Sequence, residues 1–154
     1  MKAIKRSYLV EINLGNTAPG NGANINFQDY PQLRNIYLAG LTVLESNSVT
    51  KSPAGKNVVN DTKGITITLL DMQNQEVLHQ YPTQDLDPYF TSGFYRDLVP
   101  FKIQLVKSYI TILNNSGLLA NESVLINIFY YTEAEYEAAK SNQPSKRSGA
   151  RGRK

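Results

Sequence analysis

Apolar and polar residues alternate with a period of two along several short segments, which are also rich in β-branched and aromatic residues. Successive side chains of a β-strand point to opposite faces of a sheet, so this alternation predicts strands rather than helices. The predicted strands cover residues 8–14, 25–27, 35–45, 64–71, 76–81, 101–113 and 123–131. Both faces of 35–45 are apolar, which predicts a central strand, whereas the short 25–27 segment is expected to pair at an edge.

The segments between these strands are of two kinds. Residues 15–24 and 46–63 concentrate Gly, Asn, Ser and Pro, which favour turns, so we expect two long polar loops there. Residues 71–75 predict a hairpin turn that delivers the strand 76–81. Between Pro82 and Pro100 the alternation is lost, but the segment is too apolar for a solvated loop. We therefore expect an ordered excursion, with one short helical turn, packed on the body.

One predicted strand carries an irregularity. Within 101–113 the apolar positions change from the odd-numbered Phe101, Ile103 and Leu105 to the even-numbered Val106, Ile110 and Ile112. A period-two ribbon cannot keep one buried face through such a change unless a bulge or bend resets it. The sequence therefore predicts a bulge or bend at 105–107.

The pattern as a whole indicates the fold class. Residues 132–140 have high helix propensity and early acidic residues, which suit a helix N-terminus, and form the single helix that we predict. Six to eight strands with so little helix predict an all-β protein, either an antiparallel β-sandwich or a partly closed barrel, of jelly-roll or immunoglobulin-like type. We expect one domain over 1–139, followed by a basic tail over 140–154 that has no large apolar residue and is disordered in isolation.

Composition removes several classes of function. The 154 residues include no cysteine and a single histidine, which excludes cysteine-ligated metal sites, thiol catalysis and multi-histidine metal centres. No apolar run approaches the roughly 20 residues of a membrane-spanning helix, and no secretory signal is visible. We therefore expect no metal, no cofactor, and a protein that is neither secreted nor membrane-bound.

The residues that could support catalysis have ordinary structural explanations. His79 lies in a predicted strand without a partner nucleophile motif, which favours a surface or cross-strand histidine. Asp85 and Asp87 are spaced to share a cation, but the further oxygen ligands of a calcium loop are not evident. The glycine-rich segment 15–22 opens no predicted helix, so it does not resemble a phosphate-binding loop. We therefore expect no enzymatic activity and no small-molecule substrate.

Charge is unevenly distributed along the chain. Residues 7–139 contain thirteen acids and seven cations, a net charge of −6, whereas residues 140–154 contain six cations and no acid. A flexible polycation can bind an acidic protein surface or follow a phosphate backbone without reading its sequence. The predicted partner-binding residues are Lys140, Lys146, Arg147, Arg151, Arg153 and Lys154.

The ten tyrosines leave two alternatives open. Aromatic side chains displayed on a sheet can stack nucleobases, but such a site needs a basic groove, and the body is acidic. Tyrosine also suits half-buried sheets and protein interfaces, because it combines an apolar body with one polar tip. We favour the core or interface role and keep base stacking as the alternative.

The general character of the chain is similar to that of a known group of proteins. An acidic all-β body with long polar loops, segments such as Phe94–Leu98 and Lys107–Ile112, and a short basic tail resembles the small virion structural proteins of tailed, crAss-like bacteriophages, in particular their auxiliary capsid and connector proteins. The resemblance implies a non-enzymatic subunit of a symmetric virion, assembled in the host cytoplasm, that binds other capsid proteins through loops and basic termini. The alternative is a nucleic-acid-binding module with a basic tail and base-stacking tyrosines.

Overall fold

The computed structural model describes residues 4–15, 22–43, 51–59, 64–86, 96–113 and 120–141. Eight strands dominate it: β1 Arg6–Asn13, β2 Ala23–Asn26, β3 Ile36–Val43, β4 Ile65–Leu70, β5 Glu76–Pro82, β6 Arg96–Lys102, β7 Tyr109–Ile112 and β8 Ser123–Thr132. Three short 3-10 turns connect some of them: η1 Pro31–Leu33, η2 Thr83–Leu86 and η3 Leu105–Lys107. The helix α2, Glu133–Ser141, follows β8 directly.

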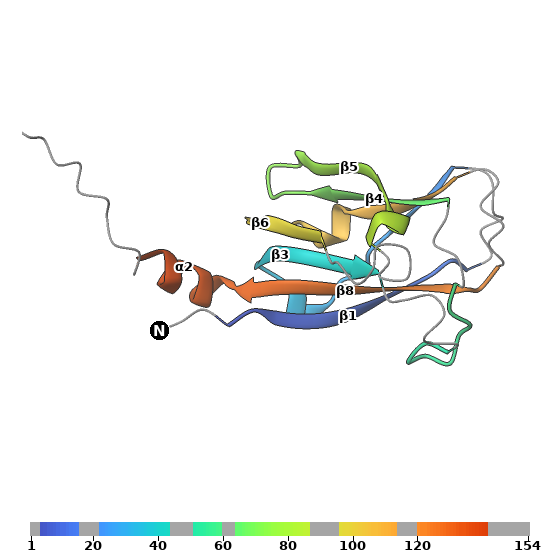
Figure 1. The fold of residues 1–154 in the computed structure, drawn as a ribbon, viewed down its shortest axis with the longest axis horizontal. Coiled ribbons are helices and arrows are strands. Elements are labelled where there is room, and N and C mark those ends of the chain that lie inside the picture. The colour runs from blue at the N-terminus through green and yellow to red at the C-terminus, as the bar shows by residue number, and fades with distance from the viewer. Residues whose placement is uncertain are drawn as a thin grey trace, which may run out of the picture.

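The strands form two four-stranded antiparallel sheets, with the orders β1-β8-β3-β6 and β2-β7-β4-β5 (Figure 1). The pairing is nested, because β1 pairs with β8, β2 with β7, β3 with β6 and β4 with β5. A long hairpin that rolls up on itself produces this order, which is that of a jelly roll. The prediction of an all-β antiparallel sandwich is confirmed, and the sheets do not close into the alternative barrel.

The core lies between the two sheets and is built from alternate residues of each strand. Val10 and Ile126 from one sheet, and Ile67 and Ile110 from the other, have 0% of their surface exposed. Burial of such aliphatic side chains is the main favourable contribution to the stability of a domain of this size. The predicted central strand 35–45 corresponds to β3, which lies between β8 and β6, and the predicted edge strand corresponds to β2.

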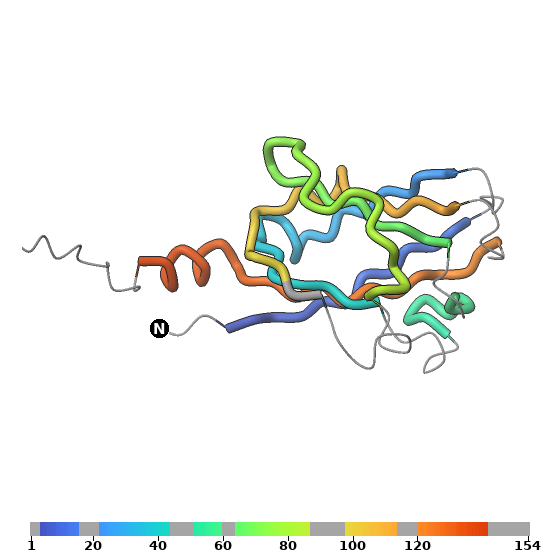
Figure 2. The backbone as a smooth tube through the Cα atoms, turned by 45° about the horizontal axis from the view of Figure 1, so that its top comes forward, coloured from blue at the N-terminus to red at the C-terminus, as the bar shows by residue number. Residues whose placement is uncertain are grey.

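Antiparallel pairing fixes which segments meet at each end of the sandwich. The segment before β1, the helix α2 and the connections 27–35, 71–75 and 103–108 lie at one end, which we call the terminal end (Figure 2). The C-terminal ends of β1, β3, β5 and β7 lie at the opposite end, which we call the loop end. Segments that are far apart in the sequence are therefore neighbours at the terminal end.

The prediction of one strand over 101–113 is wrong, although its irregularity was placed correctly. β6 belongs to one sheet and β7 to the other, and η3 lies at the crossing between them. The two sheets face the core from opposite sides, so the buried positions change parity where the chain crosses. β6 also begins at Arg96, within the segment for which no strand was predicted. The alternation of apolar and polar residues in β6 is interrupted by a bulge, in which Leu98, Val99 and Pro100 together face Ala39 of β3.

The predicted polar loop 46–63 is in part packed on the body. Within its described residues 51–59, Ser52, Val58 and Val59 are buried, and Val58 forms a parallel bridge with Ser123 at the start of β8. The last two residues of the other predicted loop, 15–24, belong to β2 instead: they are Ala23 and Asn24. Residues 16–21 of that loop lie outside the described part of the chain. The predicted helix 132–140 is confirmed as α2.

Each sheet edge has a local feature. β2 is only four residues long. On β5, two residues face Thr68 of β4, and one of them, Gln80, has a φ of 44° and donates its N–H to the Thr68 hydroxyl at 3.1 Å. The bulge opposite Ala39 occupies the β6 edge, where Val99 is 88% exposed. On β1, the carbonyl of Glu11 accepts a hydrogen bond from the Tyr30 hydroxyl at 3.1 Å.

Candidate partner-binding end of the sandwich

The helix α2 is the described segment from which the basic tail continues. Its start is a capping box: the Thr132 hydroxyl accepts the N–H of Glu135 at 3.3 Å, and the Glu135 carboxylate accepts the N–H of Thr132 at 3.4 Å. Both bonds satisfy backbone donors that have no partner within the helix. The end of β8 thus passes without an intervening loop into a helix with a fixed first turn.

Ion pairs hold α2 against the ends of other strands. Arg6 of β1 donates two hydrogen bonds to Glu135, at 2.7 and 3.3 Å. The Arg6 guanidinium, together with the capping bonds from Thr132, lowers the pKa of Glu135 from 4.5 to about 2. Lys102 of β6 forms a second ion pair, with Glu133 at 2.8 Å, and this hydrogen bond raises the pKa of Lys102. The two edge strands of this sheet, β1 and β6, therefore both hold α2 in position.

Tyrosine rings complete this contact. Tyr37 of β3 and Tyr136 of α2 stack with their ring centroids 3.9 Å apart and their planes 20° from parallel. The Tyr37 hydroxyl donates to the Glu137 carboxylate at 2.9 Å, and that contact raises the pKa of Tyr37. Tyr131 lies 6.4 Å from Tyr136, measured between ring centroids. Tyr37 and Tyr136 thus cover one face of each other's ring, and those two faces are not available to a nucleobase.

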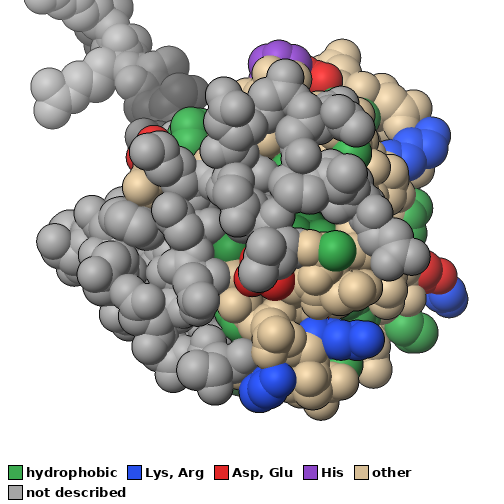
Figure 3. Space-filling model, turned by 90° about the vertical axis from the view of Figure 1, so that its right-hand side faces the viewer, with side chains coloured by type: hydrophobic (Ala, Val, Ile, Leu, Met, Phe, Trp, Pro, Cys, Tyr) green, Lys and Arg blue, Asp and Glu red, His purple; other side chains and the backbone are tan. Residues whose placement is uncertain are grey.

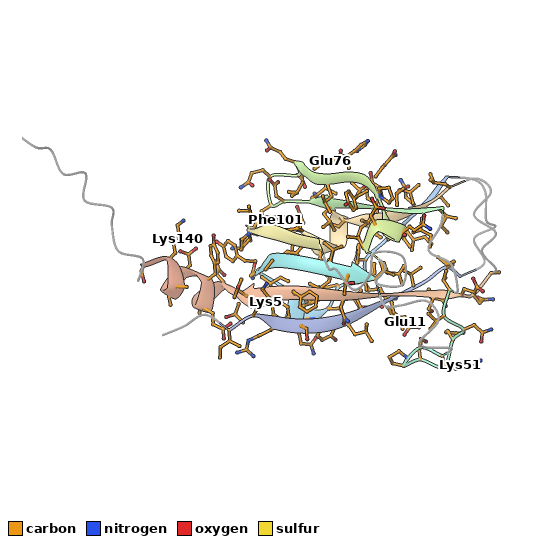
Figure 4. All side chains as sticks on the ribbon, in the orientation of Figure 1. Lys5, Glu11, Lys51, Glu76, Phe101 and Lys140 are labelled. Carbon is orange, nitrogen blue, oxygen red and sulfur yellow. The ribbon has the colours of Figure 1, made fainter. Side chains whose placement is uncertain are left out.

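The predicted partner-binding residues divide between the described and undescribed parts of the chain. Lys140 is exposed and lies on α2, beyond the ends of the strands (Figure 4). The other predicted residues, Lys146, Arg147, Arg151, Arg153 and Lys154, lie outside the described residues. The residues that anchor the root of the tail were not predicted, although the pattern Thr-x-x-Glu at 132–135 is a sequence signal for the capping box.

The candidate catalytic residues that the structure describes, His79 and Asp85, lie on separate exposed elements. His79 is 65% exposed on β5, and its Nδ1 lies 2.5 Å from the carboxylate of Glu76 on the same strand. Asp85 is exposed in η2, while Asp87 and residues 16–21 of the glycine-rich segment lie outside the described residues. Within the described ranges, His, Asp and Glu side chains form no group of three that could hold a metal. The described helices also include none that could cross a bilayer.

A cleft at the terminal end was not predicted from the sequence. It has a volume of about 300 Å³ and lies between the β2–β3 connection, the tip of the β4–β5 hairpin and the crossover from β6 to β7. Its apolar lining consists of the buried Leu33, Ile103 and Leu105 and the exposed Met72 and Val106. The rest of the lining is polar: Gln28, Asp29, Tyr30, Arg34, Asn35 and Gln104. An ion pair between Asp29 and Arg34 lies at the rim. Because three separate connections build the cleft, no local pattern in the sequence announces it.

The loop end presents a different surface. Where side chains are described on this face, basic, acidic and apolar groups are interspersed rather than gathered by kind (Figure 3). The anchored helix, the exposed Lys140 and the cleft instead belong to the terminal end. Comparison of the chain with protein-family models, with curated proteins and with solved structures found no match.

Proposed function

We propose that the protein is a non-enzymatic structural subunit of a virion, either a capsid-associated protein or a head–tail connector protein. The observation that carries the proposal is the strand order, β1-β8-β3-β6 packed on β2-β7-β4-β5. Jelly rolls of eight strands form viral capsid domains, and they also form lectin and cupin domains. The sequence resemblance to small phage virion proteins favours the first of these uses.

The terminal end supports the same proposal. Ion pairs and a tyrosine stack fix α2, so the basic segment that follows starts from a defined position on the body. A polycation on a short tether acts at high effective concentration, although each exposed charge pair is worth only about 0–1 kcal/mol. The tail is thereby suited to hold a neighbouring acidic subunit of a repeating assembly.

The proposal is tested by incorporation of purified protein into genome-free shells or onto purified shell protein. Replacing Arg151 and Arg153 with Ser should leave the fold unchanged and weaken incorporation. The matched control replaces Lys51 and Lys56, two exposed cations at the loop end, with Ser and should bind like the wild type. Wild-type binding should also weaken with added salt.

The nucleic-acid alternative predicts a different result in the same experiment. A tail that binds phosphate would require DNA or RNA, and the wild type would then fail to bind empty shells. Salt sensitivity alone cannot separate the two, because release of counterions from nucleic acid is also salt-dependent. Binding that appears only when nucleic acid is present would overturn the structural proposal and support the alternative.

A further inference from the structure

We propose that the cleft at the terminal end binds a single neutral pyranose ring, such as the terminal sugar residue of a glycan. The proposal follows from the mixed lining of the cleft, its lack of net charge and one buried acceptor that has no donor. A volume of about 300 Å³ is at the lower end of the range for small-molecule sites, so the cleft takes one ring rather than an extended chain. The inference goes beyond the proposed structural role and does not depend on it.

The side-chain oxygen of Gln104 is an acceptor that the chain itself leaves without a donor. Gln104 lines the cleft, and its Oε1 is buried and accepts no hydrogen bond within the described part of the chain. Buried polar atoms of native proteins nearly always have a hydrogen-bond partner, so an exception points to a function. The terminal torsion of a glutamine side chain is broad, so rotation of the amide presents this oxygen to the cleft. A ligand that satisfies Gln104 therefore carries an N–H or O–H donor.

The described lining of the cleft carries no net charge. Among the described residues that line it, Asp29 and Arg34 alone are charged, and Arg34 donates to Asp29 from its Nε at 3.0 Å and from its Nη2. This contact lowers the pKa of Asp29 and raises the pKa of Arg34, so both stay ionised and their charges cancel. An ionic ligand has to compete with this pair, whereas a neutral ligand leaves it intact. The charge of the cleft thus favours a neutral ligand.

The polar lining combines donors and acceptors. Gln28 and Asn35 each carry an amide that both donates and accepts. Arg34 uses two of its N–H groups on Asp29 and keeps the others as donors, while the Gln104 oxygen accepts. A hydroxyl group is both a donor and an acceptor, so a ring with several hydroxyls can satisfy such a mixture. A peptide side chain that is small enough for the cleft ends in one polar group and leaves the rest unsatisfied.

The apolar lining fits the C–H groups of a sugar. Leu33, Ile103 and Leu105 are at most 6% exposed, whereas Met72 and Val106 are each 43% exposed. A pyranose ring carries C–H groups as well as hydroxyls, and contact with them removes part of the exposed apolar surface from water. Apolar walls with a few fixed polar groups are the usual composition of a small-molecule site.

Contacts with neighbouring strands hold both walls of the cleft. The ion pair at the rim spans η1, and the Tyr30 hydroxyl donates to the Glu11 carbonyl of β1 at 3.1 Å. On the other wall, the backbone N–H of Gln104 donates to the Leu70 carbonyl of β4 at 2.9 Å. A site that is formed before the ligand arrives loses less conformational entropy on binding.

The test is an NMR titration of the purified, nitrogen-15-labelled chain with methyl glycosides of glucose, galactose, mannose and N-acetylglucosamine. We expect at least one glycoside to shift the side-chain amide signals of Gln104 and Asn35 in a saturable way. The affinity should not depend on salt, because the ligand is neutral. Adenosine monophosphate and N-acetylglutamine methylamide, which probe for a nucleotide and a peptide, should leave these signals in place.

Two results of the titration overturn the proposal. The first is that no glycoside shifts these signals at about 100 mM, a hundredfold above a millimolar dissociation constant. The second is that the nucleotide or the peptide probe binds more tightly than every glycoside.

Gln104→Leu separates binding from folding. The substitution removes the buried acceptor, so the thermal midpoint should stay unchanged or rise, while the dissociation constant of the glycoside should rise roughly tenfold or more. Gln84→Leu is the matched control, because Gln84 is also half-buried but lies in η2 at the loop end. It should leave glycoside binding unchanged.

Asn35→Gly gives a second measure that does not depend on the stability of Gln104→Leu. Asn35 has a φ of 56°, which glycine adopts freely, so the substitution removes the side-chain amide without straining the backbone. Glycoside binding should weaken in this variant as well. If Gln104→Leu and Asn35→Gly bind like the wild type, or if Gln84→Leu weakens binding as much as they do, the cleft is not the site.

Discussion

Ile126→Ala is the most direct test of the core described above. Ile126 lies in β8 with 0% of its surface exposed, and it faces Val10 of β1 and Val43 of β3 across the strand pairs. The substitution removes three buried carbons, at about 0.8 kcal/mol each for transfer alone, and leaves a cavity between the two sheets that relaxation fills only in part. The expected loss is about 2–5 kcal/mol, and Ile126→Val should cost only about 0.5–1.5 kcal/mol.

The assay is urea unfolding followed by far-UV circular dichroism, with a thermal melt as a second measure. The midpoint should fall while the slope m stays constant, and Tm should drop by roughly 4–20 °C for a chain of this size. His79→Ala is the control, because His79 is 65% exposed and a surface substitution usually changes stability by less than about 0.5 kcal/mol. If Ile126→Ala left the midpoint unchanged and His79→Ala unfolded the protein, the strand registers would be refuted.

Three further predictions concern α2. The pKa of Glu135 is about 2 in the folded protein, below its ordinary 4.5, so its contribution to holding α2 is present above about pH 4.5 and is lost as pH falls through about 2. NMR shifts of the Tyr136 ring should follow this titration in the wild type and should not do so in Glu135→Gln. Thr132→Ala removes the helix cap and should cost about 0.5–2 kcal/mol, measured as faster amide hydrogen exchange in the first turn of α2, with no change there rejecting the cap. Truncation after Ser141 should change the free energy of unfolding by less than about 0.5 kcal/mol, measured by a thermal melt, and an unfolded product would show that the tail contributes to the core.

The sequence was sufficient to predict most of the fold because strand alternation is a local property. β1, β3, β4, β5 and β8 all coincide with predicted segments to within a few residues. The exception is the segment 101–113. Its apolar residues change from odd to even positions, and this change is the same whether one strand is bulged or the chain crosses to the opposite sheet. Only the pairing of Tyr37 with Lys102, and of Ile110 with Ile25 and Ile67, distinguishes the two cases.

The candidate site was harder to predict for a physical reason. Arg6 and Glu135 are separated by 129 positions, and the contact between them exists only because β1 pairs with β8. The cleft likewise depends on Leu33, Met72 and Val106, which come from three connections that nested pairing brings to one end. The basic tail could be predicted from the sequence because a cluster of charges is visible in the composition of the segment. The contacts that hold α2 at its start could not, because they depend on which strands pair.

The edges of the two sheets decide how copies of this protein can meet at high local concentration. An unguarded edge is a template onto which any other strand can add without limit, which leads to fibres. Here Gln80 and Val99 interrupt two edges by bulges, β2 offers only four residues, and the Tyr30 hydroxyl occupies the Glu11 carbonyl on the fourth. At high concentration these edges therefore favour side-chain contacts between copies, which have a fixed stoichiometry, over open-ended backbone pairing. Deletion of Gln80, together with deletion of Val99 and Pro100, would leave one residue opposite Thr68 and one opposite Ala39, and the expected result is thioflavin-positive aggregation at concentrations where the wild type stays dispersed.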